Sequence, residues 1–250
     1  MLKNLFKSIL PAKFLRILKN IKNDYLSELA HKSYSQEGED MILRRIFENQ
    51  ENGFYVDVGA HHPKRFSNTY FFYKHGWKGI NIDALPNSMS LFKKLRPRDV
   101  NIEQSISDTV ESLTYYQFNE PALNGFSKDL SEKRDRDGKY KITNKEILNT
   151  ERLDYILEKY MPTKQTIDFL SIDVEDYDYK VLKSNSFEKY EPKVILIEIL
   201  ENNLNDIRHN EIYKFLETKN YMLYSKCVNT VIFMLEKYYK ETHQKTNYDK

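Results

Sequence analysis

The stretch Gly53-Phe-Tyr-Val-Asp-Val-Gly59 decides the fold, because a short apolar run that ends on glycine is typical of a buried parallel strand feeding a turn. Gly79-Ile-Asn-Ile-Asp-Ala84 and Ile167-Asp-Phe-Leu-Ser-Ile-Asp173 repeat this form and end at or beside a carboxylate. Lys193-Val-Ile-Leu-Ile-Glu-Ile199 is a further such run. Helical segments separate the runs, so we expect a mostly parallel sheet with right-handed crossovers and helices on both faces.

The remaining predicted elements complete a Rossmann-like α/β fold. We predict further elements as follows: helices around 67–73, 89–95, 151–160 and 210–219, strands over 100–107 and 113–118, and an antiparallel terminal hairpin from 221–224 and 230–234. The strand over 113–118 is expected at a sheet edge. Residues 121–149 are polar, rich in lysine and without a clear period, which predicts an insertion that could act as a lid.

The chain is expected to divide into one domain with two flanking segments. Its 250 residues suit a single α/β domain over residues 33–235. Residues 1–32 form a basic amphipathic segment bent near Pro11. Such a segment either contacts a membrane surface or a partner, or packs on its own domain as most amphipathic helices do. The tail, residues 236–250, is polar and is expected to fray.

Charge and cysteine content narrow the expected partners and compartment. The 39 basic and 37 acidic residues leave a net charge of +2, so we expect no nucleic-acid groove. Cys227 is the single cysteine, and no apolar stretch reaches the ~18 residues of a membrane span. These features predict a cytoplasmic protein, with peripheral contact at the inner face of the membrane if the N-terminal segment docks there. Homo-oligomer formation stays open.

Glycine and carboxylate residues gather where the predicted parallel strands end. Gly59 would let backbone amides approach a ligand closely. The turn after this strand lacks the three glycines of a dinucleotide fingerprint, so a ligand without phosphates fits better. Asp83 ends the next strand, where a carboxylate can accept both ribose hydroxyls of an adenosine. The alternative role of Asp83 is that of a helix cap or turn residue.

Four motifs follow one another along the chain: Ser33-Tyr-Ser-Gln-Glu-Gly-Glu-Asp40, Gly53-Phe-Tyr-Val-Asp-Val-Gly-Ala-His-His-Pro63, Phe66-Ser-Asn-Thr-Tyr-Phe-Phe-Tyr-Lys-His-Gly-Trp-Lys-Gly-Ile-Asn-Ile-Asp83 and Phe169-Leu-Ser-Ile-Asp-Val-Glu175. In this order they resemble the FkbM family of methyltransferases. The resemblance implies a class I fold with a seven-stranded sheet and S-adenosylmethionine as the cofactor. It also implies O-methylation, typically of sugars in surface polysaccharides or of natural products.

The resemblance also implies roles for individual residues. Asp57, Gly59 and Ala60 would line the methionine end of the cofactor, and Asp83 would hold the ribose. Ser107 and Asp108 would lie beside the adenine. Gln36 belongs to a segment that would close over the cofactor or acceptor. Asn68 and Asp173 complete the implied cofactor-binding set. The chain departs from the family pattern after Glu175, where Asp176-Tyr177-Asp178 stands in place of the usual glycine.

Methyl transfer to a hydroxyl needs an aligned acceptor and a group that takes its proton. Asp173, Glu175 and Glu198 could supply a general base, or could together hold magnesium or manganese. In the alternative interpretation, Asp173 binds the cofactor amine and Glu175 caps the following helix. His61 or His62 could also act as a base or bind the acceptor. We expect one of these rings to be functional and the other structural.

Three classes of function remain compatible with the sequence. The first is methylation of a sugar hydroxyl, on a nucleotide-linked sugar or on a surface polysaccharide such as capsule or lipopolysaccharide. The second is methylation of RNA or protein, against which the near-zero net charge weighs in the case of RNA. The third is a non-catalytic module that retains the cofactor fold and binds a partner. A small-molecule or glycan acceptor is the partner that the four motifs favour.

Overall fold

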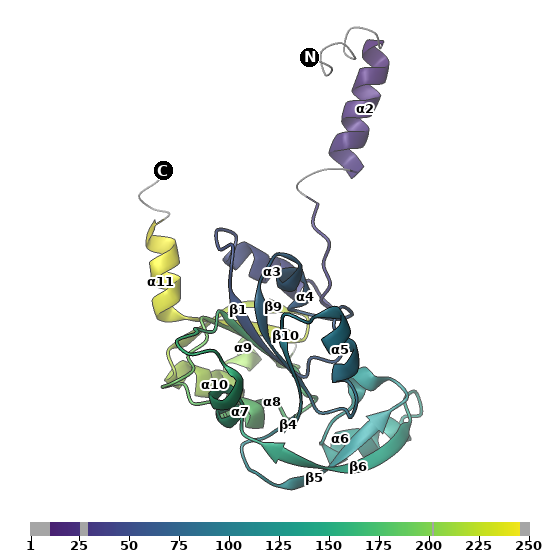
Figure 1. Ribbon diagram of the computed structural model, residues 1–250, viewed down its shortest axis with the longest axis vertical. Helices are drawn as coiled ribbons and strands as arrows, with labels where there is room; N and C mark the ends of the chain where they lie inside the picture. Colours follow the sequence, from purple (N-terminus) through teal and green to yellow (C-terminus); the bar gives the residue numbers. More distant parts are fainter. Residues whose placement is uncertain (1–10, 26–29, 202, 246–250) are drawn as a thin grey trace. The chain divides into compact units, whose positions relative to one another are not determined.

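The structure, a computed structural model, describes residues 11–25, 30–201 and 203–245 (Figure 1). The chain forms two separate units, the first ending at Ser33 and the second beginning at Tyr34. The first unit contains helix α2, Ala12–Tyr25, which begins directly after Pro11. Among the described residues, no helix is long and apolar enough to cross a membrane. Parts of the predicted N-terminal segment, residues 1–10 and 26–29, lie outside the described residues.

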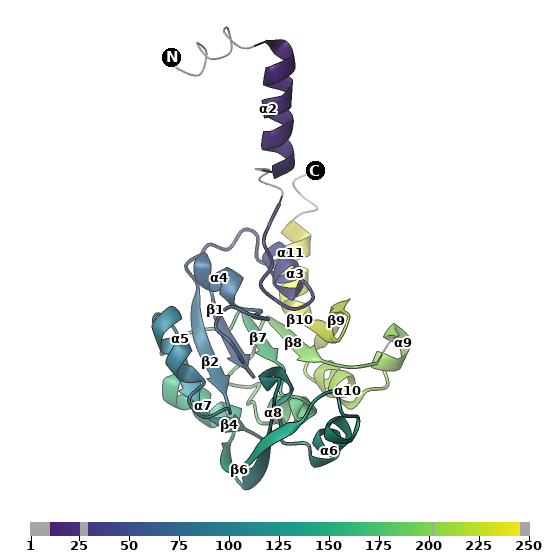
Figure 2. The ribbon, with the colours of Figure 1, turned by 90° about the vertical axis from the view of Figure 1, so that its right-hand side faces the viewer.

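The second unit is built on one seven-stranded sheet of order β3-β2-β1-β7-β8-β10-β9 (Figure 2). Its strands are β1 (Phe54–Val58), β2 (Lys78–Asp83), β3 (Val100–Glu103), β7 (Phe169–Ile172), β8 (Val194–Glu198), β9 (Tyr221–Cys227) and β10 (Thr230–Leu235). The first five strands of this order are parallel, whereas β10 runs antiparallel to both β8 and β9. The prediction of a mostly parallel, Rossmann-like sheet with an antiparallel terminal hairpin is confirmed.

Helices cover both faces of this sheet because its strands alternate apolar side chains between them. Val56 and Val58 pack into one core with helices α7 (Leu153–Tyr160), α8 (Asp178–Lys183) and α10 (Glu211–Thr218). Tyr55 points to the opposite core, which contains α3 (Glu39–Ile46) and α4 (Tyr70–Lys74). Two shorter helices are α5 (Met89–Leu95) and α9 (Leu204–Ile207). The carboxyl ends of β1, β2, β7 and β8 remain open for a ligand.

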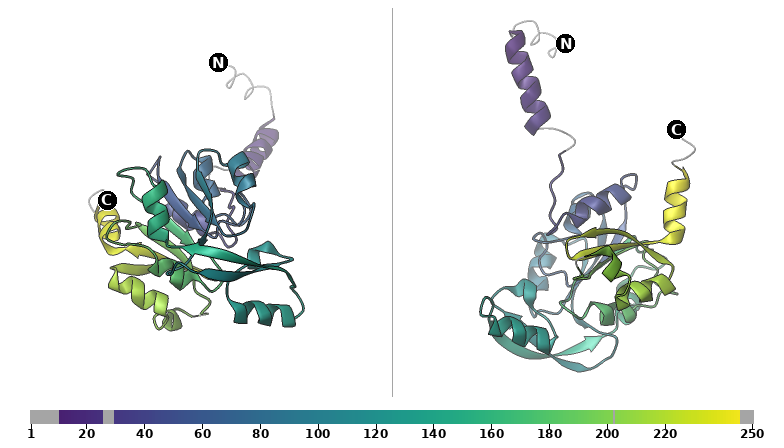
Figure 3. Two further views of the ribbon diagram at one scale, coloured as in Figure 1. Left: turned by 60° about the horizontal axis from the view of Figure 1, so that its bottom comes forward. Right: turned by 180° about the vertical axis from the view of Figure 1, so that it is seen from behind.

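The predicted strand over 100–107 and the predicted insertion both differ from expectation. The strand is interrupted after β3, and β4 (Ser105–Ile106) joins a second sheet of order β4-β6-β5. The segment expected at an edge of the main sheet is β5 (Ser112–Phe118), which pairs with β6 (Ile142–Glu151). Between them lie η1 (Pro121–Leu123) and α6 (Lys128–Arg136), in the teal part of Figure 3. Strand β6 escaped prediction because nearly all its residues are exposed or half-exposed, so it has no apolar alternation.

The tail also differs from the prediction of a frayed segment over its described part. Residues Glu236–Lys245 form helix α11. Two tyrosines supply the apolar contact that the sequence pattern did not indicate, since Tyr238 and Tyr239 both pack against the core on the α3 side of the sheet. The ring of Tyr238 lies 6.1 Å from that of Phe47 between centroids. Residues 246–250 lie outside the described residues.

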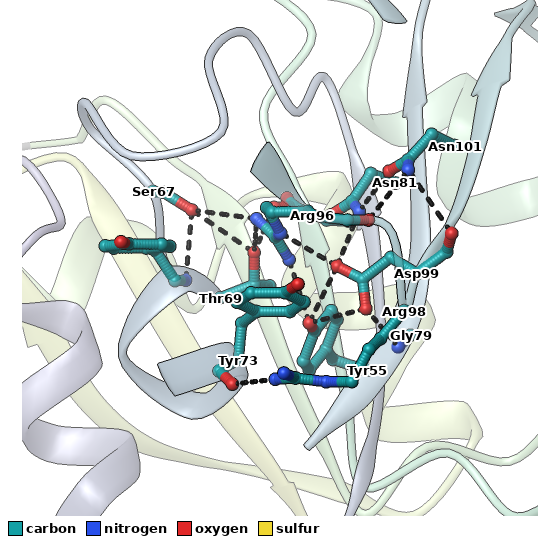
Figure 4. A network of polar contacts seen from close by, with 12 residues as sticks. Tyr55, Ser67, Thr69, Tyr73, Gly79, Asn81, Arg96, Arg98, Asp99 and Asn101 are labelled. Carbon is teal, nitrogen blue, oxygen red and sulfur yellow. Dashed lines mark hydrogen bonds and ion pairs between the residues drawn. The ribbon is translucent and has the colours of Figure 1, made fainter. Parts of the chain in front are cut away.

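A fully buried arginine joins the first two strands to α4 (Figure 4). The Arg96 side chain has no exposed surface, and its Nε donates to Asp99 Oδ2 at 2.8 Å. The other guanidinium nitrogens donate to Thr69 Oγ1 and to the Tyr55 hydroxyl, both at 2.9 Å. Asp99 in turn accepts the backbone amide of Gly79 at 3.0 Å. A buried charge persists only when it is paired and hydrogen-bonded in this way, so these partners depend on one another.

Replacement of Arg96 tests the contribution of this network to stability. We expect Arg96→Ala to lower the free energy of unfolding by about 3–5 kcal/mol, because it leaves the Asp99 carboxylate buried and uncompensated. Arg45→Ala is the matched control: Arg45 also pairs with an acid three residues later, Glu48, but its side chain is 71% exposed. That variant should lose less than about 0.5 kcal/mol. Urea denaturation followed by circular dichroism measures both, and equal losses would show that burial of the pair is unimportant.

Candidate cofactor and acceptor site

Two adjacent cavities lie where the parallel strands end. The first is a narrow slot of about 60 Å³, and the second is a wider cavity of about 530 Å³. Five residues line both cavities, which places the cavities next to one another: Gly59, His61, Ala122, Asp173 and Glu175. The size of the second cavity lies within the range of small-molecule sites. A ligand that enters the slot and one in the wider cavity would therefore meet at these shared residues.

Asp83 lies at the end of β2 and lines the slot. Its carboxylate accepts the backbone amides of His61 at 2.7 Å and Leu85 at 2.8 Å. These bonds join the turn after β1 to the turn after β2, which is the turn role considered from sequence. An ionised carboxylate has about four acceptor positions, so two amides leave capacity for the paired hydroxyls of a ribose. The two roles of Asp83 are thus compatible.

The backbone conformation and the close approach of the turn after β7 both require glycine at position 59. Its φ is 83°, and a Cβ at this position would lie 1.8 Å from the carbonyl oxygen of Asp173. The Gly59 and Ala60 amides both donate to the Ile82 carbonyl at 3.0 Å. These two amides are therefore paired within the chain, although Gly59 itself lines both cavities. The glycine permits close contact between the turns after β1 and β7.

Other residues assigned to the cofactor by resemblance lie outside the lining of both cavities. Asp57 is buried below the edge, where it accepts the Thr69 hydroxyl at 2.9 Å, and burial raises its pKa. Ala60 belongs to a small apolar cluster with Met89 and Phe92 on α5. These two residues support the slot from beneath.

Ser107 and Asp108 do not line the slot, although the preceding residue, Ile106, does. Ser107 is fully buried, and its amide donates to the Glu151 carbonyl at 3.0 Å. Asp108 pairs with Lys183 at 2.9 Å. The slot is lined instead by Gln104 and Ile106, with aromatic walls from Tyr115 and Phe126. The sequence pattern predicted one continuous strand over residues 100–107, with the ligand beyond its end. In the structure the strand is interrupted between β3 and β4, and Gln104 at this interruption lines the slot together with Ile106.

Gln36 and Asn68 line the wider cavity rather than the slot. The Asn68 side-chain amide donates to Ser171 Oγ on β7 at 3.1 Å, which fixes its orientation. Gln36 belongs to the segment before α3, and the neighbouring Glu37 accepts the backbone amide of Asn229 at 3.0 Å. The Ser35-Gln36 segment and the β9–β10 turn therefore form one wall of the wider cavity.

The two histidines have different environments, which agrees with the expectation that their roles differ. His62 Nδ1 accepts the backbone amides of Lys64 and Arg65, both at 3.0 Å, so this ring holds the turn. His61 lines both cavities and has a φ of 51°. Burial, followed by the charge of Arg65, lowers the pKa of His61. His62 thus has a structural role, whereas His61 lies in the lining of both cavities.

A group of carboxylates lies between the ends of β7 and β8. Burial, and next the neighbouring Glu198, raises the pKa of Asp173 well above its usual range. Burial, and next Glu175, raises the pKa of Glu198 to about 7. Asp178 was not predicted as a site residue, but it is fully buried beside Glu198, which also raises its pKa. Asp178, rather than Glu175, bonds the backbone of this turn, by accepting the Val174 amide at 3.3 Å.

The predicted magnesium or manganese site on Asp173, Glu175 and Glu198 is not supported. Within the described part of the chain, no group of three His, Cys, Asp or Glu side chains is placed to hold a metal ion. Glu175 is instead paired with Arg134 of α6 at 2.6 Å, and its backbone φ is 54°. A guanidinium beside the carboxylate takes the place that a cation would need. The insertion therefore supplies the positive charge at this position.

The fold and this edge define an S-adenosylmethionine-dependent methyltransferase of class I. The chain belongs to the FkbM family, because the family model described as "Methyltransferase FkbM domain" matches residues 57–223. The resemblance drawn from the four sequence motifs is confirmed, and with it the assignment of the chain as an enzyme. The acid-lined edge suits this cofactor, whose sulfonium and amino groups are both cationic.

Solved structures of similar fold include two methyltransferases. One is a TehB-like SAM-dependent methyltransferase from Corynebacterium glutamicum, with a TM-score of 0.41, 9% identity, and coverage of 89% of this chain and 96% of that chain. The other is a protein assigned as a type 11 methyltransferase from Sulfolobus solfataricus, with a TM-score of 0.37, 12% identity, and coverage of 81% and 94%. No curated protein matches the chain.

Replacement of Asp83 tests its role as the ribose acceptor. We expect Asp83→Ala to weaken binding of S-adenosylhomocysteine by at least about 100-fold, because both ribose hydroxyls lose a charged acceptor. Glu103→Ala is the matched control, since Glu103 stands opposite Asp83 on the adjacent strand and does not line the slot. Calorimetric titration measures both affinities. Similar binding by the Asp83 variant and the unmodified chain would contradict the assignment.

Chelation tests the absence of a catalytic metal. Methyl transfer should stay within about twofold of its starting rate after dialysis against EDTA, because a guanidinium occupies the place of a cation. The rate is measured by transfer of a labelled methyl group before and after dialysis. A large loss that added magnesium or manganese restores would overturn this view of the carboxylates.

Proposed function

We propose that the chain transfers the methyl group of S-adenosylmethionine to a sugar hydroxyl, with Glu198 as the general base. The observation that carries the proposal is the position of Glu198, at the end of β8 in the wider cavity, with a pKa of about 7. A base with this pKa is half deprotonated near neutral pH and still basic enough to accept a proton. Asp173 lines both cavities, so in this proposal it would lie between cofactor and acceptor.

The reaction is a direct displacement at the methyl carbon. The acceptor oxygen attacks the methyl group as the carbon–sulfur bond breaks, and the electron pair of that bond neutralises the sulfonium. The hydroxyl proton passes to the Glu198 carboxylate, so that the products are a methyl ether and S-adenosylhomocysteine. Alignment of the two reactants supplies much of the rate, and proton removal supplies the rest.

The wider cavity offers polar groups that suit a sugar. Gln36, Asn68 and Thr230 line it and carry amide or hydroxyl groups that can bond to ring hydroxyls. Phe66 and Tyr140 line it as well, and Phe66 is 44% exposed, which leaves an aromatic surface for the apolar face of a sugar ring. The proposed acceptor is therefore a nucleotide-linked sugar or a surface polysaccharide such as capsule or lipopolysaccharide.

The charges of the cavity weigh against RNA as the acceptor. Its two arginines are both paired, Arg65 with Glu120 at 2.7 Å and Arg134 with Glu175 at 2.6 Å. A polynucleotide acceptor would need cations that are available for its phosphates. Carboxylates such as Glu37 and Glu198 line the same cavity and would repel phosphate groups. A neutral sugar unit meets no such repulsion, so a nucleotide-linked sugar would have to keep its diphosphate outside this cavity.

The acceptor class is tested by turnover. The purified chain is incubated with labelled S-adenosylmethionine and three groups of acceptors: nucleotide-linked sugars, capsule or lipopolysaccharide fragments, and RNA or peptides. We expect labelled product in one of the saccharide groups, and nuclear magnetic resonance then locates the methyl ether. Transfer to RNA or peptide without transfer to any saccharide would contradict the proposal, and binding of the cofactor without any turnover would favour a non-catalytic module.

The role of Glu198 is tested by substitution and by pH. Glu198→Gln should lower kcat by about 10²- to 10⁴-fold and leave S-adenosylhomocysteine binding largely unchanged. Glu201→Gln is the matched control, since Glu201 lies three residues further on and lines neither cavity. In the unmodified chain kcat should rise tenfold per pH unit below about 7, where Glu198 becomes deprotonated, and level off above it.

A second variant separates Glu198 from His61 as the base. The charge of Arg134 lowers the pKa of Glu198, so Arg134→Gln should move the rising limb of the profile to higher pH. His61 has a lowered pKa and would give a limb below the usual range of histidine. His61 would be identified as the base if the rising limb of the kcat profile lay in that acidic range. The limb should then stay in place in Arg134→Gln and persist in Glu198→Gln.

A further inference from the structure

Helix α2 has one apolar face and one basic face. Phe14 and Ile17 are three residues apart on the helix, and their side chains are 47% and 46% exposed. The exposed cations Lys13, Arg16 and Lys19 occupy other positions of the helix. Exposed apolar side chains beside a row of cations are typical of a helix that lies in a lipid interface.

The positive charge of the chain is concentrated in this segment. Residues 1–23 hold six of the 39 basic residues and none of the 37 acidic residues. The remaining chain therefore has 33 basic and 37 acidic residues, and its net charge is −4. An anionic surface would attract the N-terminal segment and repel the rest. Within α2 the single acid is Asp24, in the last turn.

We propose that α2 binds along the surface of an anionic lipid bilayer. Its apolar face lies in the boundary between headgroups and acyl chains, and its cations contact the phosphate and other acidic headgroup oxygens. The long aliphatic parts of the lysine and arginine side chains allow their charges to remain in water while the helix is partly immersed. Because α2 belongs to a separate unit of the chain, this contact does not require the cofactor edge to change.

The charge of the helix favours lipid over the other surfaces that could cover an apolar face. A second copy of α2 has the same positive sign and so offers no complementary charge to the basic face. The remainder of the chain has a net charge of only −4, whereas an anionic bilayer presents a continuous negative surface. Cations contribute to binding at such a surface individually, at roughly a fivefold gain in affinity for each lysine or arginine.

Vesicle binding of the full chain tests the proposal. Vesicles of phosphatidylcholine with about 30% phosphatidylglycerol are compared with vesicles of phosphatidylcholine alone, by co-sedimentation at low and high salt. We expect binding to the anionic vesicles and its loss at high salt. The double variant Phe14→Ser with Ile17→Ser should bind at least about tenfold more weakly. Lys13→Gln with Lys19→Gln should also lose about tenfold or more and show less dependence on salt.

A control and a depth measurement separate immersion from simple electrostatic attraction. Asn20→Ser changes an exposed polar residue of the same helix and should bind as the unmodified chain does. Tryptophan emission of Phe14→Trp should shift to shorter wavelength on anionic vesicles, whereas that of Asn20→Trp should not. The native Trp77 is buried and gives a constant background in both variants. Equal shifts in the two variants would overturn the assigned orientation.

Three results would overturn the proposal. The first is absence of binding to anionic vesicles by the full chain. The second is equal binding by the unmodified chain and the Phe14/Ile17 variant, which would assign the contact to another surface. The third is self-association in analytical ultracentrifugation that the same variant removes, without vesicle binding, which would assign the apolar face to a second copy. Cofactor affinity and turnover are also measured on every variant. A failure of membrane binding can then be distinguished from a failure of the proposed methyl transfer.

Discussion

The burial of one guanidinium organises the half of the sheet that carries the site. Arg96 has no exposed side-chain surface, so its charge is tolerated only because Asp99, Thr69 and Tyr55 surround it. Thr69 also donates to Asp57, directly below the slot. The same network thus fixes the spacing of β1 and β2 and supports the turn whose amide Asp83 accepts. Loss of the cation would leave several polar groups without partners at once.

The site sets a group of buried carboxylates against one guanidinium, that of Arg134. Burial raises the pKa of Asp173 and of Glu198, the neighbouring Glu198 and Glu175 respectively raise them further, and Arg134 lowers the pKa of Glu198. The pKa of Glu198 is about 7 as a result, and Asp173 lines both cavities.

The sequence predicted those parts of the fold that are buried. The strands around Val56 and Ile195 are apolar on both faces, so their pattern is unambiguous, and Asp83 follows from its place at a strand end. Strand β6 could not be recognised because it is solvated on both sides. The metal prediction failed for a different reason: Arg134 precedes Glu175 by 41 residues, and no local pattern shows that they pair. Contacts of this kind exist only in the folded chain.

The insertion has a consequence for how such an enzyme can diverge. Residues 121–140 contribute Ala122 to both cavities, Tyr140 to the wider cavity, and Arg134 to the charge balance of the base. One contiguous stretch of the gene therefore encodes walls of both cavities, since Phe126 of the same insertion lines the slot, while Asp83 at the end of β2 is encoded elsewhere. An exchange of this stretch that reshapes the wider cavity would have to keep the residues that line the slot.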